Sequence, residues 1–180
     1  MGSSIRTTAV WPLLVFLMFL AFAGWASEVF ASDDELSRNS LRGLQGIDVA
    51  VEYHDPDAER DGLTKGQIQA DVELRLRKAG IKVLTSEESL KLPAGSPILY
   101  VDVHSVFMKG IIPIYIFSID VELEQDVSLV RSPDIQVRGT TWSKSMMGTI
   151  DKKKLGRVRE NINDLVDKFI NVYLAANPKK

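Results

Sequence analysis

The chain has no cysteine, two histidines and almost no excess of charge, and each shortage excludes a class of protein. Without cysteine there is no disulfide, no thiolate nucleophile, no thiolate metal site and no lipid-modified cysteine after an export signal. A formal net charge of −2 gives no general attraction for nucleic acid, which needs concentrated positive charge. The basic run 152–154 is therefore interpreted as a solvated helix start, and we expect no nucleic-acid partner.

The N-terminal apolar run is shorter than the roughly 20 residues that a spanning helix needs. This run, 11–23, follows the single cation Arg6, and small residues then offer cleavage sites that end at Ala23, Ala26 or Ala31. That order is typical of a secretory signal peptide. We therefore predict a signal peptide over residues 1–31 and an exported protein, periplasmic or secreted, with an uncleaved membrane anchor as the alternative.

The rest of the chain is predicted to be a flexible lead-in over residues 32–45 and a single α+β domain over residues 46–177. Helical spacing predicts a helix over 65–79, opened by a Thr64–Gln67 capping box, and a long C-terminal helix that ends before Pro178. Runs of strand character lie at 47–53, 81–84, 98–107, 114–127 and 135–145. The order β-α-β-β-β-β-α predicts a mostly antiparallel sheet of about five strands with two helices on one face.

The strand predicted at 114–127 divides its side chains between an apolar face and an acidic face. Its acidic face carries Asp120, Glu122, Glu124 and Asp126, which indicates a sheet with one buried and one wet side. In the next strand we expect four residues to share one side: Arg138, Thr140, Trp142 and Lys144. The two cations among them could then pair with the acids across the strands. Asp120, Glu122 and Glu124 are also candidates for binding a basic partner.

The turn predicted between the strands 98–107 and 114–127 is unusually apolar. Two interpretations are open: its side chains fold under the sheet edge as core, or they form an exposed patch for a protein partner or a membrane surface. Under the second interpretation the partner-binding residues are Phe107, Met108, Ile111 and Ile112.

Acidic residues alternate in the loop 54–62, as at the start of a calcium-binding loop. Asp57, Glu59 and Asp61 are the candidate ligands, although the twelfth position of such a loop is occupied by Ile68 rather than by a bidentate acid. The alternative is a polar turn whose negative charge favours the N-terminus of the following helix. Calcium is the one cofactor that the pattern allows, and none is otherwise expected.

Asp102 and His104 lie two residues apart, on the same face of one predicted strand. They are the candidate centre of a small metal-dependent or hydrolytic enzyme, or His104 pairs with carboxylates of a neighbouring strand on a wet sheet face. Nucleophile elbows and phosphate-binding glycine loops are missing from the sequence. We therefore expect a non-enzymatic protein-binding or envelope assembly module, with an enzyme and a small-ligand carrier as alternatives. An open strand edge could recruit an envelope protein or a second copy of the chain.

Two segments carry a resemblance to known proteins. Residues 71–81 (DVELRLRKAGI) and residues 165–178 (LVDKFINVYLAANP) resemble a family of small, uncharacterised exported bacterial proteins. The order of elements is also similar to small α/β envelope assembly domains, namely the N-terminal domain of the Tol–Pal translocation protein and the lipoprotein activators of peptidoglycan synthases. This likeness implies a role in the envelope and transfers no functional residue.

Overall fold

The computed structural model describes residues 35–92 and 95–178. The chain divides into two units, Met1–Phe30 and Ala31–Lys180, and the described residues all belong to the second unit. The predicted signal peptide, the first residues of the lead-in and the candidate cleavage sites lie outside the described residues. Among the residues that are described, no helix is both long enough and apolar enough to cross a bilayer.

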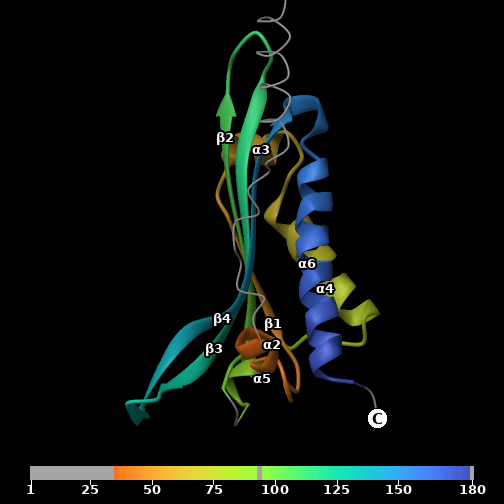
Figure 1. Cartoon of the computed structure of the whole chain (residues 1–180). Helices are drawn as coiled ribbons and strands as arrows, with labels where there is room; N and C mark the ends of the chain where they lie inside the picture. The colour runs from red at the N-terminus through yellow and green to blue at the C-terminus, as the bar shows by residue number, and fades with distance from the viewer. Residues whose placement is uncertain (1–34, 93–94, 179–180) are drawn as a thin grey trace, which may run out of the picture. The chain divides into compact units, whose positions relative to one another are not determined.

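A four-stranded sheet in the order β1-β2-β3-β4 organises this unit (Figure 1). Its strands are β1 (Asp48–Tyr53), β2 (Ile98–Met108), β3 (Ile114–Leu129) and β4 (Ser132–Asp151). The first pair is parallel and the other two pairs are antiparallel, so the sheet is mixed. The α+β class is confirmed, whereas the fifth strand is not found. Residues 81–84 make a single bridge, between Val83 and Ile47, because the chain turns into a helix directly afterwards.

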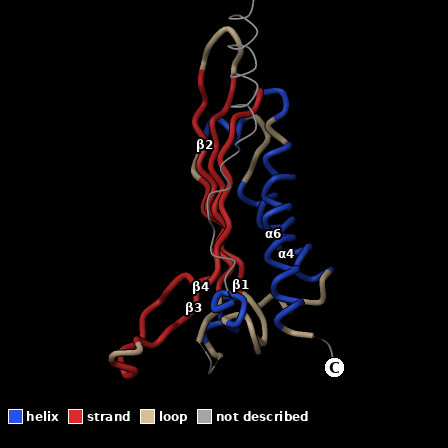
Figure 2. The backbone as a smooth tube through the Cα atoms, viewed as in Figure 1, coloured by secondary structure: helices blue, strands red, loops and turns tan. Residues whose placement is uncertain are grey.

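Helices lie before, between and after the strands (Figure 2). They are α2 (Glu35–Asn39), α3 (Pro56–Arg60), α4 (Lys65–Lys78), α5 (Ser86–Leu90), the 3-10 turn η1 (Lys152–Lys154) and α6 (Arg157–Ala176). The predicted capping box is confirmed: the Gln67 N–H donates to Thr64 Oγ1, and the Thr64 N–H donates to Gln67 Oε1. Gly80, at a φ of +81°, ends this helix in the left-handed region where glycine carries no steric penalty.

The hydrophobic core lies between one face of the sheet and the helices α4 and α6. Helix α6 runs along the sheet with α4 beside it (Figure 1). The Arg159 guanidinium of α6 donates to both carboxylate oxygens of Asp71 of α4, at 2.8 and 2.9 Å, and so fixes the two helices against each other. The fully buried side chains of the two helices are Ile68, Val72, Leu76, Val158, Ile162, Leu165, Val166 and Phe169.

Residues 35–45 are part of the domain rather than a flexible lead-in. The side chain of Leu41 is completely buried in the core. The Asn177 side chain holds this segment from both sides, because its amide donates to the Leu41 carbonyl at 2.8 Å and its oxygen accepts from the Gly43 N–H at 2.8 Å. Within the described residues the hydrophobic core extends from Leu41 to Ile170. Unit 31–180 is compact by itself, so it is the part of the chain to study alone.

A β-bulge changes which side chains of β4 share a face. Leu123 pairs with Trp142 and the next residue, Glu124, pairs with Thr140, so Thr141 has no partner in the ladder. Before the bulge the even-numbered residues of β4, such as Arg138, lie on the outer face, whereas from Trp142 onward the even-numbered residues lie on the inner face. The prediction that Arg138, Thr140, Trp142 and Lys144 share one side is therefore wrong: Lys144 pairs with the core residue Val121, on the inner face.

Candidate functional site

The segment 106–114, which we call the hairpin tip, joins β2 to β3 and exposes most of its apolar side chains. Met108 pairs with Ile114, and the turn lies between them. Ile111 is fully exposed, Ile112 is 65% exposed and Val106 is 59% exposed. Large apolar side chains seldom form a patch on a surface that contacts nothing but water. The side chains of Met108, Ile111 and Ile112 are therefore exposed rather than folded under the sheet edge, while a partner for them stays a prediction.

Phe107 differs from the other predicted tip residues, because it packs against the core. Its ring lies 5.0 Å from that of Tyr115, centroid to centroid. The ammonium of Lys152 lies 5.1 Å from the centroid of the same ring, within cation–π distance. Phe107 therefore packs against the core at the base of the hairpin tip and is not part of its exposed surface.

The base of the hairpin tip is held by a network around Asp61. The Tyr115 hydroxyl donates to Asp61 Oδ2 at 2.6 Å, and Lys152 Nζ lies 2.8 Å from the same oxygen. The Lys152 N–H also donates to the Pro113 carbonyl at 3.1 Å, which ties the end of β4 to the tip. The bond from Lys152, followed by the bond from Tyr115, lowers the pKa of the Asp61 carboxyl. Burial, followed by the bond to Asp61, raises the pKa of Tyr115.

Replacing this carboxylate, as Asp61→Asn, is expected to lower the melting temperature at neutral pH and to remove part of the acid sensitivity. A carboxyl whose pKa is lower in the folded state stabilises the fold above its unfolded pKa of about 4, and this stabilisation is lost as the pH falls through the folded pKa. The gap in melting temperature between wild type and variant should therefore narrow as the pH falls below about 4. A gap that stays constant across the acid range would contradict this account.

The predicted calcium ligands do not lie in a loop. Residues 56–60 form helix α3, because Asp55 caps it by accepting from the N–H groups of Asp57 and Ala58 at 2.9 and 3.1 Å. Asp57 is paired with Arg60, and Asp61 is bound by Lys152 and Tyr115. In the described part of the chain no three acidic or histidine side chains are grouped to hold a metal ion. Calcium binding by Asp57, Glu59 and Asp61 stays a prediction from the sequence that this geometry does not support.

The outer side of the sheet carries an acidic face, formed by Glu52, Asp102, Asp120, Glu122 and Glu124. Glu52, Asp102 and Asp120 lie directly opposite one another across β1, β2 and β3. Hydroxyl groups meet most of these carboxylates. Tyr100 donates to Glu52, Ser145 donates to Asp120 at 2.6 Å, and Thr140 donates to Glu122 at 3.2 Å. Arg138, one of the two cations expected to meet the acids, pairs with Asp126 at 3.3 Å.

His104 pairs with Asp102 of its own strand rather than with a carboxylate of the neighbouring strand. Its Nε2 lies 3.0 Å from Asp102 Oδ2, and the imidazole is mostly exposed on the outer face. Ser118 lies opposite His104 in the β2–β3 register, but no hydrogen bond between these two described residues is present. A nucleophile is activated when a base holds it by a hydrogen bond in a site shielded from water. The observed pair on an open sheet face supplies neither condition.

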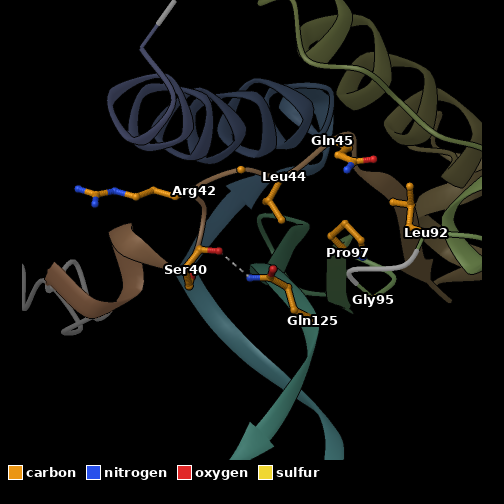
Figure 3. A pocket seen from close by; sticks show the side chains of 9 residues that line it. Ser40, Arg42, Leu44, Gln45, Leu92, Gly95, Pro97 and Gln125 are labelled. Atoms are coloured by element: carbon orange, nitrogen blue, oxygen red, sulfur yellow. Dashed lines mark hydrogen bonds between the residues drawn. The ribbon is translucent and has the colours of Figure 1, made fainter.

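A small pocket lies at the other end of the sheet, where β2 begins after Pro97 (Figure 3). Ser40, Leu44, Pro97 and Gln125 are among its lining residues, and its volume is about 150 Å³. The Gln125 amide that faces it already donates to the Ser40 carbonyl and to Thr141. Sites for small organic ligands usually measure about 300–1,000 Å³, so this pocket gives little support to a ligand carrier.

Comparison with known proteins finds no matching family model and no matching curated protein. Several solved structures are similar to the chain, and two of them are as follows. One is a minor lipoprotein from Acinetobacter baumannii, 8% identical, which covers 73% of this chain and 91% of its own, with a TM-score of 0.40. The other is the dodecamer of a PelC variant from Paraburkholderia phytofirmans, 15% identical, covering 72% of this chain and 87% of its own, with a TM-score of 0.41. Similarity this weak carries no argument, so the resemblance to exported bacterial proteins stays a prediction.

Sequence reasoning missed one feature of the hairpin tip, which is the basic run beside it. Strand β4 continues to Asp151, which pairs with Ile114, and so delivers residues 152–154 to the base of the tip. The predicted strand ended at residue 145, too early to reveal this. The strand-favouring residues Thr149 and Ile150, preceded by the apolar pair Met146 and Met147, were the signal that could have extended the strand.

Proposed function

We propose that this protein is a non-enzymatic binding module of the cell envelope and that the hairpin tip is its docking point. The observation that supports the proposal is the exposure of Ile111, Ile112, Met108 and Val106 on a tip whose base is firmly held. Docking residues supported by a rigid scaffold lose little conformational freedom on binding. The export signal predicted from the sequence is the reason for placing this module in the envelope.

The hairpin tip is a better docking point than the acidic face. Asp120 and Glu122 of the acidic face accept hydrogen bonds from neighbouring strands, so their carboxylates already have partners. The tip side chains are apolar, so any contact that removes them from water makes the free energy of binding more favourable. The acidic residues Asp120, Glu122 and Glu124 are therefore proposed as a secondary surface for a basic partner.

The double substitution Ile111→Asp with Ile112→Asp is expected to reduce binding to the envelope at least about tenfold, because it places two charges where apolar surface is to be buried. Unit 31–180 is mixed with envelope fraction from the producing cell, and bound protein is measured after sedimentation. Both residues are exposed, so the variant should keep the wild-type melting temperature.

The matched control is Val130→Asp with Ile135→Asp, which charges two exposed apolar residues of the β3–β4 hairpin instead. This control should bind as wild type does. Undiminished binding by the tip variant would sink the proposed function, and loss of binding by the control alone would move the docking point to the other hairpin. A tip variant that fails to fold would show that the tip is core.

A further inference from the structure

We infer that the hairpin tip docks on the surface of an anionic phospholipid bilayer, with its isoleucines in the interface and a basic collar on the headgroups. The basic collar consists of Lys109, Lys153, Lys154 and Arg157. This inference rests on the proposed function and names the occupant of the docking point.

The collar is assembled by the fold from two separate parts of the chain, the turn at residue 109 and the segment 153–157. Lys109 lies in the turn of the hairpin tip itself. Lys153 and Lys154 follow Lys152, whose N–H is bonded to the Pro113 carbonyl, and Arg157 begins α6 at the same end of the sheet (Figure 1). Apolar and basic side chains thus meet at one end of a domain whose chain carries a net charge of −2.

Arg157 is the one cation of the collar that makes an ion pair within the described residues. Asp61 pairs with Lys152, which is why Lys152 is not counted in the collar. Asp151 caps η1 by accepting from the Lys153 N–H at 2.8 Å, and Glu160 lies 3.6 Å from Arg157. Within the described residues no ion pair involves Lys109, Lys153 or Lys154. The segment 103–119, which contains the whole hairpin tip, has no acidic residue.

This combination of chemistry fits a lipid surface better than a protein groove. Apolar side chains at the extremity of a hairpin can enter the boundary between headgroups and acyl chains, while lysines around them meet phosphates. The turn leaves backbone polar groups unpaired, and these cannot enter the hydrocarbon core without a large penalty. Docking is therefore shallow, with Ile111 and Ile112 in the interface and the lysine ammonium groups at the headgroup level.

Co-sedimentation with protein-free vesicles tests the inference. Unit 31–180 should bind vesicles that contain about one third phosphatidylglycerol in phosphatidylethanolamine, and should bind pure phosphatidylcholine at least about tenfold more weakly. Raising the salt to about 0.5 M should weaken binding, because it screens the attraction between collar and phosphates.

Two charge variants distinguish the contribution of the collar lysines to vesicle binding from that of the overall charge of the protein. Lys109→Gln with Lys153→Gln and Lys154→Gln is expected to weaken binding to anionic vesicles about 100-fold. The control removes three exposed lysines from helices α4 and α6, as Lys65→Gln with Lys78→Gln and Lys168→Gln, and should weaken it far less. Equal losses in the two variants would overturn the inference, since binding would then follow overall charge.

A tryptophan placed on the tip reports its position directly. Trp142 is the single tryptophan of residues 31–180 and is 1% exposed, so it gives a constant background. In the variant Ile112→Trp, the new indole should become shielded from acrylamide and shift its emission to the blue when anionic vesicles are added. An indole that stays equally quenched on bound vesicles would show that the tip does not enter the interface, which overturns the inference.

The vesicle and envelope experiments together distinguish an error in the lipid inference from an error in the proposed function. If wild type ignores protein-free vesicles but binds the envelope through Ile111 and Ile112, the lipid inference is wrong and the docking point belongs to a protein. If the tip variant still binds the envelope, the proposed function itself is wrong. Equal binding to anionic and neutral vesicles would show that the charge of the collar does not contribute to binding, and would overturn the inference.

Discussion

The substitution Trp142→Ala is expected to lower the free energy of unfolding by about 3–5 kcal/mol, the largest loss for any single change considered. The indole is 1% exposed and packs edge-on against Phe169 of α6, with ring centroids 5.1 Å apart. Removing it opens a cavity between β4 and α6 that the surrounding side chains can fill only in part. Urea unfolding of unit 31–180, followed by far-UV circular dichroism, measures the loss.

Two further variants test whether packing is the cause. Trp142→Phe should lose much less, because it keeps a ring against Phe169 and removes a buried indole N–H that has no hydrogen-bond partner in the structure. Val137→Ala, at an exposed position of the same strand, should change stability by no more than about 0.5 kcal/mol. A loss below about 1 kcal/mol for Trp142→Ala would refute the role of this residue as the contact between β4 and α6.

Gly148→Ala is expected to cost about 1–3 kcal/mol, although alanine is normally tolerated in a strand. Gly148 pairs with Phe117, and a Cβ atom added to it would lie 3.0 Å from Phe117 Cζ and 3.3 Å from Cε1. Phe117 is almost completely buried in the core, so its ring cannot move aside without disturbing its neighbours. Thermal and urea unfolding of the variant measure the cost.

In the Phe117→Leu background, Gly148→Ala should cost less stability than it does in the wild type, because the smaller side chain leaves room for the added methyl group. Gly66→Ala is the control for glycine replacement. It lies in α4, where an added Cβ has no neighbour within 4 Å, and should stabilise the protein by about 0.5–1 kcal/mol. Additive losses in the paired variant would refute the clash with Phe117.

Several elements could be predicted from local sequence. The capping box at Thr64 and Gln67 and the glycine at position 80 set the start and end of α4, because each acts through bonds or backbone angles within one helical turn. The alternation from Tyr115 to Leu123 likewise identified the buried face of β3, since successive side chains of a strand point to opposite faces.

Other features could not be read from local sequence. The bulge at Thr141 reverses the alternation of β4, and it is defined only by the pairing with Leu123 and Glu124 of another strand. The acidic residues 55–61 suggested a cation loop, but Asp55 caps a helix and Asp61 meets Lys152 from the far end of the chain. Alternation and spacing carry no information on such partners.

The sequence by itself determined the α+β class, the two long helices, the apolar and acidic faces of β3 and the apolar character of the hairpin tip. These properties follow from periodicity and capping, which depend on residues a few positions apart. The tertiary structure alone decided the order of the strands, the exposure of Ile111 and Ile112, and the meeting of the tip with Lys153 and Lys154. The physical reason is strand pairing, because the hydrogen bonds between Ile114 and Asp151 and their neighbours join residues that are far apart in the chain.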